Sequence, residues 1–192
     1  NLPPTAVAHE YDAVEDTKLN VPVAKGLLAG SADPESDTRT VDTTVGTEPT
    51  KGTVVLSADG SFEYTPDENE NGLDSFTYRV SDGKGAFSAY MTVTIDIEAV
   101  NDLPVALDET HDINRGATIT DAVSGTDVSN ETPVNELKYV LVTGPTQATG
   151  FTLNPNGTFE YIHDITKNST PDTFTFRVKD GDDELSELVG TV

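Results

Sequence analysis

Leu56-Ser-Ala-Asp-Gly-Ser-Phe-Glu-Tyr64 returns in the second half of the chain as Leu153-Asn-Pro-Asn-Gly-Thr-Phe-Glu-Tyr161. A second pair, Asp74-Ser-Phe-Thr-Tyr-Arg-Val-Ser-Asp-Gly83 and Asp172-Thr-Phe-Thr-Phe-Arg-Val-Lys-Asp-Gly181, repeats at nearly the same spacing, with offsets of 97 and 98 residues. Asn101-Asp-Leu-Pro104 also echoes Asn1-Leu-Pro-Pro4. Self-similarity at a fixed period indicates tandem copies of one structural unit. The sequence therefore predicts two modules, at residues 1–103 and 104–192.

Within each copy, apolar residues alternate with polar ones over short runs, which is the pattern of half-buried strands. We expect the alternating residues to face one core in each module: Phe62, Tyr64, Phe76, Tyr78 and Val80, then Phe159, Tyr161, Phe174, Phe176 and Val178. No segment has the period of an amphipathic helix. About seven short strands per copy predict an all-β fold of two tandem Greek-key β-sandwiches of immunoglobulin-like size.

Turn residues separate these strands. Asp59-Gly60 and Asn156-Gly157 stand where tight hairpin turns need a positive φ, and Asp82-Gly83 with Asp180-Gly181 marks a second hairpin in each copy. Asp82 and Asp180 are interpreted mainly as turn residues, because aspartate before glycine needs no metal to explain it.

The composition excludes several classes of function. The chain has 34 acidic and 11 basic side chains and a formal net charge of −23, which argues against binding nucleic acid or an anionic membrane. It has no cysteine, so disulfides and thiolate chemistry are excluded. No apolar run approaches the roughly 20 residues of a membrane span, so we expect no direct membrane insertion. Hard divalent cations with oxygen ligands are the natural partners of so acidic a chain.

With these motifs the chain resembles the bacterial cadherin-like repeats of large surface adhesins, which are related to VCBS repeats. The resemblance covers essentially the whole chain and rests on Val14-Glu-Asp-Thr17, Ala32-Asp-Pro-Glu-Ser-Asp37, Asp59 to Pro66, Asp74 to Tyr78, and Val100-Asn-Asp-Leu-Pro104. It implies an extracellular or cell-surface protein, calcium as the bound ion, and neighbouring repeat modules of the same chain as partners. The implied function is a calcium-rigidified extender and adhesion module, with calcium clamping the joint between modules.

The resemblance also implies the calcium ligands. Glu15 resembles the early-strand glutamate of cadherins, and Asp67 with Asn69 resembles the acidic pair before the sixth strand. Asn101 and Asp102 resemble the linker motif, and Asp127 the aspartate of the following domain. Asp33, Glu35 and Asp37 would form half of a site shared with a preceding module, and Glu131 is a further candidate. Calcium takes six to eight oxygens, so ligands must converge from several loops, as they do where two modules meet.

The two copies differ at the implied ligand positions. Glu15 aligns with Arg115, and the stretch from Asp67 to Asn69 aligns with Ile165 to Lys167. These changes remove anionic ligands and introduce basic residues. We therefore expect calcium at the junction of the copies and weak or no binding at the far end of the second.

Two other classes of function are alternatives for such a chain. A calcium-dependent carbohydrate-binding module, attached to a polysaccharide-degrading or adhesive protein, is the stronger alternative, with a cell-surface or polysaccharide ligand. The chain has no tryptophan, so Tyr11, Tyr90 and Tyr139 are the candidate aromatic contacts. An enzyme is not expected, because His9, His111 and His163 stand alone, without HExxH spacing or a nucleophile elbow.

Overall fold

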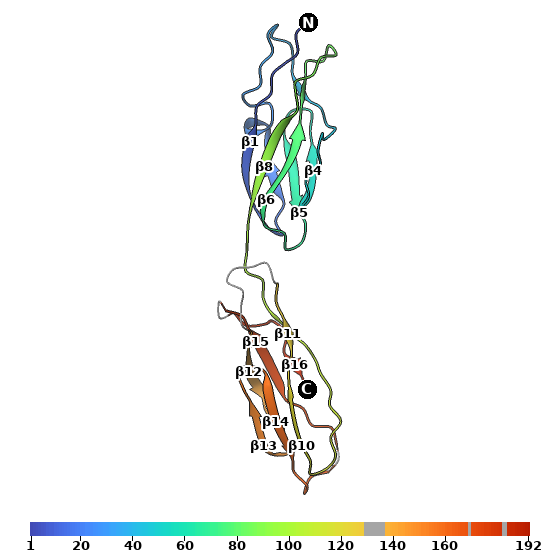
Figure 1. Cartoon of the computed structure of the whole chain (residues 1–192), viewed down its shortest axis with the longest axis vertical. Helices are drawn as coiled ribbons and strands as arrows, with labels where there is room; N and C mark the ends of the chain where they lie inside the picture. The colour runs from blue at the N-terminus through green and yellow to red at the C-terminus, as the bar shows by residue number, and fades with distance from the viewer. Residues whose placement is uncertain (129–136, 169, 182–183) are drawn as a thin grey trace. The chain divides into compact units, whose positions relative to one another are not determined.

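The computed structural model describes residues 1–128, 137–168, 170–181 and 184–192 (Figure 1). The chain forms two units, Asn1–Val100 and Asn101–Val192, and each is an all-β sandwich. One short 3-10 turn, η1 (Val23–Lys25), interrupts the strands of the described residues. No described helix is long and apolar enough to cross a bilayer.

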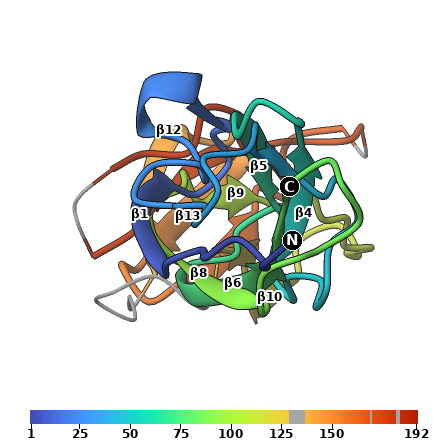
Figure 2. The ribbon, with the colours of Figure 1, turned by 90° about the horizontal axis from the view of Figure 1, so that it is seen from above.

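The first unit is built from strands β1 (His9–Val14), β2 (Leu19–Val21), β3 (Thr40–Val41), β4 (Gly52–Leu56), β5 (Phe62–Pro66), β6 (Gly72–Tyr78), β7 (Val80–Ser81) and β8 (Met91–Glu98). One sheet has the order β1-β8-β6 and the facing sheet β2-β5-β4, while β3 pairs with β7. Figure 2 shows β8 and β6 on one side of this unit and β5 and β4 on the other. β1 runs parallel to β8, and the other pairs are antiparallel.

The second unit repeats this plan with strands β9 (Val105–Ala106), β10 (Thr118–Ala122), β11 (Gly125–Thr126), β12 (Lys138–Thr143), β13 (Ala148–Leu153), β14 (Thr158–His163), β15 (Thr175–Lys179) and β16 (Gly190–Thr191). Its sheets have the orders β10-β14-β13 and β12-β15-β16, and β9 pairs with β11. All of these pairs are antiparallel.

The alternating residues form the two cores, as the sequence predicts. In the first unit Phe62 is 2% exposed, and Tyr64, Phe76, Tyr78 and Val80 are fully buried. Their counterparts in the second unit are also buried: Phe159, Tyr161, Phe174, Phe176 and Val178. Burying each such side chain contributes about 1.5–3 kcal/mol, so the repeated apolar pattern is the main source of stability in both sandwiches.

The predicted turns at Gly60, Gly83 and Gly157 have the backbone that favours glycine. Gly60 has φ +89° and Gly157 has φ +85°, values in the left-handed region that favours glycine. Gly83 follows Asp82 with φ +70°. The turn chemistry therefore fixes the register of the β4–β5 and β13–β14 hairpins.

A carboxylate connects the sheets of each unit, and in the first unit it is buried. Asp74 is 5% exposed, and it accepts hydrogen bonds from Tyr64 Oη (2.6 Å) and from the backbone N–H groups of Thr50 (2.9 Å), Lys51 (3.0 Å) and Ser75 (2.8 Å). Burial is the largest single influence and raises the pKa of Asp74, but the hydrogen bonds together outweigh it and lower the pKa. The carboxylate is therefore held in its charged form inside the fold.

The second unit repeats this arrangement. Asp172 accepts hydrogen bonds from Tyr161 Oη (3.1 Å) and from the N–H groups of Thr146 (2.9 Å), Gln147 (2.7 Å) and Thr173 (3.0 Å). Its pKa is likewise lowered against the opposing effect of burial. The repeated Asp-Ser/Thr-Phe motif thus encodes a structural clamp in both copies.

Candidate metal-binding clusters

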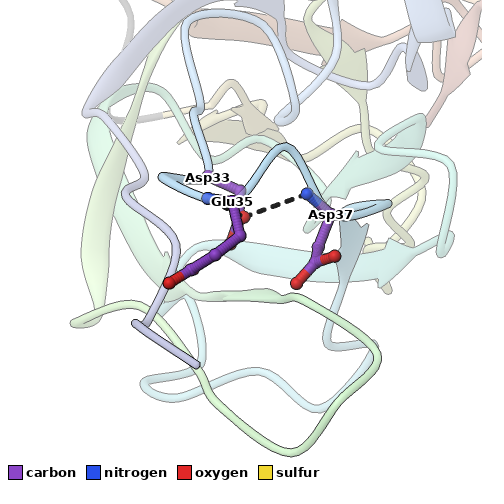
Figure 3. Close-up of side chains that lie close together, drawn as sticks. All are labelled: Asp33, Glu35 and Asp37. Carbon is purple, nitrogen blue, oxygen red and sulfur yellow. Dashed lines mark hydrogen bonds between the residues drawn. The ribbon is translucent and has the colours of Figure 1, made fainter.

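The N-terminal acidic cluster consists of Asp33, Glu35 and Asp37. Ligand oxygens of the three carboxylates all lie within 4.8 Å of one another, and they form the one such group of three among the described residues. The loop turns back on itself, because Asp33 Oδ1 accepts the N–H of Glu35 (2.9 Å) and of Asp37 (3.0 Å), as Figure 3 shows for Asp37. Ser36 completes this turn with φ +64°. The sequence-predicted trio is therefore assembled by the fold.

The spacing of these oxygens fits a calcium ion. Calcium binds oxygens at about 2.3–2.6 Å, so two ligands of one ion lie within about 5 Å of each other. Asp33 Oδ2 and Asp37 Oδ2 are buried atoms that accept no hydrogen bond from any described residue. A buried carboxylate oxygen without a partner is costly, so both atoms favour a cation beside them.

Lys84 already supplies one positive charge to this cluster. Its Nζ lies 2.6 Å from Asp37 Oδ1, and this hydrogen bond, with the charges of Asp37, Asp33 and Asp82, raises the pKa of Lys84. The lysine side chain is 60% exposed. This ion pair therefore lies at the surface, where such pairs contribute little to stability.

An Asn–Asp contact recurs at the start of each unit. Asn1 Nδ2 donates to Asp82 Oδ2 (2.6 Å), and Asn101 Nδ2 donates to Asp180 Oδ2 (3.0 Å). The other oxygen of each aspartate serves its turn: Asp82 Oδ1 accepts the N–H of Lys84 (2.8 Å), and Asp180 Oδ1 accepts that of Glu184 (2.8 Å). The prediction that Asp82 and Asp180 are turn residues thus accounts for Oδ1 of each aspartate. It does not account for Oδ2, which accepts the asparagine amide.

A second cluster gathers beside Val100, the last residue of the first unit. This Glu15 cluster consists of Glu15, Asp16, Asn69, Asn71 and Val100. Glu15 is 2% exposed, and its carboxylate accepts hydrogen bonds from Val100 N–H and from Asn71 Nδ2 (3.2 Å). Asp16 Oδ1 accepts the N–H of Asn69 (3.1 Å), and these two residues have φ +56° and +58°. The fold therefore brings Glu15 to the loop that contains Asp67 and Asn69.

Backbone strain is concentrated at these two clusters. Among the described residues other than glycine, the positive φ angles belong to Asp16, Ser36 and Asn69. Such conformations cost of order 1–3 kcal/mol and persist where surrounding contacts enforce them, often at functional sites.

The Asp180 cluster at the start of the second unit consists of Asn101, Asp102, Asp127 and Asp180. Asp180 is fully buried. Burial is the largest influence that raises the pKa of Asp127, and the charges of Asp180 and Asp102 raise it further. Negative charge is therefore crowded here, and a divalent cation would relieve the repulsion. Glu131 lies outside the described residues.

The far end of the second unit has the opposite chemistry. Arg115, the counterpart of Glu15, donates from Nε to the carbonyl of Ile165 (2.9 Å). The connection between strand and loop that Glu15 makes with a carboxylate is thus made here with a guanidinium. A guanidinium group has no acceptor atom that could bind a metal ion, so this end lacks the carboxylate ligand that Glu15 presents in the first unit.

The three candidate tyrosines have different environments. Tyr11 is half-buried and donates to the Lys25 carbonyl (2.8 Å), and Tyr139 is half-buried against Phe176, with ring centroids 5.9 Å apart. Tyr90 is 47% exposed. Tyr11 and Tyr139 therefore belong to the packing of their units, and Tyr90 faces solvent.

Residues 1–99 match the family model of the bacterial cadherin-like domain. The chain belongs to the bacterial cadherin-like domain family. Residues 101–192 of this cadherin-like chain match the model of the bacterial Ig domain. Domains of these two kinds are typical of extracellular and surface proteins and are typically structural rather than enzymatic. The relation to VCBS repeats stays a prediction.

Solved cadherins share the fold. Drosophila N-cadherin EC1-4 is 13% identical with a TM-score of 0.59, over 96% of this chain and 48% of that one. Human CDH23 EC21-23 is 18% identical with a TM-score of 0.59, over 99% and 63%. Human Protocadherin-24 EC1-2 is 15% identical with a TM-score of 0.58, over 100% and 95%. No curated protein sequence is significantly similar to this chain.

Proposed function

We propose that this chain is a calcium-rigidified extender and adhesion module of a large bacterial surface or secreted protein. Cadherin-like and bacterial Ig domains suggest an extracellular adhesion or extender role. The finer proposal is that calcium, bound by acidic side chains on both sides of the Val100–Asn101 peptide bond, stiffens the connection between the modules.

The observation that carries the proposal concerns two consecutive residues. The carboxylate of Glu15 accepts the N–H of Val100, and the carboxylate of Asp180 accepts the side-chain amide of Asn101. Consecutive Cα atoms are about 3.8 Å apart, so an acidic cluster of each unit is tied to the same short piece of chain. The proposed calcium ligands are Glu15, Asp67, Asn69, Asn101, Asp102 and Asp127. Asp180 joins this set because its carboxylate accepts the side-chain amide of Asn101.

Charge provides the physical coupling. Without a cation, the carboxylates repel one another, and the connection is free to bend. A bound calcium would turn this repulsion into attraction between groups of both units. The N-terminal acidic cluster of Asp33, Glu35 and Asp37 would serve a preceding module in the same way.

The expected strength is modest but useful. Extracellular calcium modules bind with dissociation constants of about 10⁻⁴–10⁻³ M. Calcium at about ten to a hundred times this value would stabilise the bound state by roughly 1.4–2.7 kcal/mol per site. Stiffness would therefore depend on the calcium-rich medium outside the cell.

Titration calorimetry with calcium and small-angle scattering, with calcium and with EGTA, test the proposal. We expect binding at millimolar concentration or tighter, and a longer, stiffer particle with calcium. Asp102→Ala should weaken binding about tenfold or more. Asp96→Ala is the matched control, because Asp96 is an exposed carboxylate on β8 outside both clusters.

The proposal fails if calcium gives no heat of binding, or if it binds without changing the scattering profile. If Asp102→Ala and Asp96→Ala lose the same affinity, calcium acts by general screening of negative charge and not through a specific site.

A further inference from the structure

The exposed aromatic side chains of this protein lie together. Among its seven Phe and six Tyr residues, all of which the structure describes, Phe87 (40%) and Tyr90 (47%) are the exposed ones. The guanidinium carbon of Arg79 lies 3.9 Å from the centroid of the Phe87 ring and 5.2 Å from that of Tyr90. We call Arg79, Phe87, Tyr90 and Asp42 the Arg79 platform.

The platform is held in place by its neighbours. Asp42 Oδ2 lies 2.8 Å from Arg79 Nε and 2.7 Å from Nη2, and Asp42 Oδ1 accepts the N–H of Thr44 (3.0 Å). A Cβ added to Gly46 would lie 2.3 Å from Cε1 of the Tyr90 ring, so the ring sits directly over the glycine backbone. Both rings are therefore fixed while one part of each stays in solvent.

The core does not need these rings. Phe87 and Tyr90 are absent from the buried cluster of the first unit and from the partly buried residues packed on it. Two ordered aromatic side chains kept at the surface beside an ion pair leave apolar area exposed to water, and such area commonly marks a binding site.

The second unit provides an internal comparison. Ser88 Oγ accepts the N–H of Val80 (2.9 Å), and Ser186 Oγ accepts that of Val178 (3.2 Å), which aligns the two segments. Phe87 then corresponds to Leu185, Tyr90 to Leu188 and Arg79 to Arg177. Val140, which pairs with Arg177 on the neighbouring strand, takes the place of Asp42. The same fold thus forms without the aromatic rings or the carboxylate.

We propose that the Arg79 platform binds a neutral pyranose unit of a β-linked glycan. The apolar face of such a sugar carries axial C–H groups that pack on aromatic rings, whose faces are electron-rich. The guanidinium and the carboxylate then hydrogen-bond neighbouring hydroxyl groups, since Arg79 Nη1 makes no hydrogen bond to any described residue.

A neutral glycan is favoured by charge. Asp42 already compensates the one positive charge of the platform, and the chain carries a net charge of −23, which repels acidic polysaccharides. The site contains no residue of the acidic clusters, so it goes beyond the proposed calcium function and does not depend on it.

Native affinity electrophoresis tests this proposal on the whole chain. The gels contain hydroxyethylcellulose, laminarin or galactan, with polygalacturonate as the anionic comparison, each run with calcium and with EGTA. We expect retardation in at least one neutral gel, in both buffers. Phe87→Ala and Tyr90→Ala should lower the association constant about tenfold, whereas Tyr90→Phe, which keeps the ring, should retain binding.

Leu185→Ala and Leu188→Ala are the matched controls and should leave retardation unchanged, and circular dichroism and the unfolding midpoint establish that each variant is folded. No retardation in any neutral gel overturns the proposal. So does retardation that is indifferent to the loss of both rings, or that disappears in EGTA, because the glycan would then be held elsewhere. Calcium binding is measured separately, so either proposal can fail alone.

Discussion

Replacing Asp74 by asparagine would test the clamp that connects the sheets of the first unit. Asp74 Oδ2 accepts hydrogen bonds from Lys51 N–H and Tyr64 Oη, and Oδ1 accepts those from Thr50 and Ser75. An amide placed with its NH₂ toward Lys51 leaves two donors facing each other. The tyrosine hydroxyl can turn and accept instead, but the Lys51 N–H keeps no partner.

The cost follows from these contacts. A hydrogen bond to a charged group contributes about 1.5–3 kcal/mol, and a buried unpaired N–H costs a similar amount. We expect Asp74→Asn to destabilise the first unit by about 2–3 kcal/mol, which lowers its thermal midpoint by roughly 10 °C. Asp172→Asn should cost less, about 1 kcal/mol, because Asp172 is half-buried rather than buried.

Differential scanning calorimetry and urea unfolding measure the change, and Asp96→Asn, an exposed carboxylate on β8, controls for loss of charge. A shift confined to one transition identifies the unit that is affected. If Asp74→Asn moves its midpoint no more than Asp96→Asn does, the carboxylate is not a clamp and the reasoning is wrong.

Three further measurements have expected outcomes. The pKa of Asp74 and of Asp172 is lowered in the folded state, so the stabilisation from these carboxylates is present above the unfolded-state pKa of about 3.9 and is lost as the pH falls through the lower folded-state pKa. Unfolding midpoints should therefore drop steeply below about pH 4, and a flat profile there would contradict this. Gly26→Ala should cost about 1–3 kcal/mol in urea unfolding, since the added Cβ would lie 2.1 Å from the Gly60 carbonyl oxygen; an unchanged midpoint would count against this contact. Glu15→Gln should weaken calcium binding in calorimetry, and undiminished affinity would remove Glu15 from the proposed ligands.

The sequence predicts those parts of the fold that depend on local pattern. Alternation of Phe and Tyr with polar residues is enough to identify the core, because period-two patterning decides which face of a strand is buried. Gly60 and Gly157 mark their hairpins because few other residues adopt a positive φ. These features repeat in both copies, so each copy supports the same interpretation.

Contacts between distant residues are what the sequence could not supply. Asp82 and Asp180 meet Asn1 and Asn101 across 81 and 79 residues, and no local pattern records such a contact. The sequence signal for these contacts was that both the asparagine and the aspartate occur in both copies. Lys84 in the N-terminal acidic cluster was missed for the same reason.

The parallel pairing of β1 with β8 determines how the first unit bears a pull on its two ends. His9 to Val14 lie in register with Val93 to Glu98, so a pull on the two ends loads all six residue pairs together in shear. Because the six pairs must break together, the first unit should resist a pull on its ends better than a pair of strands that opens one hydrogen bond at a time.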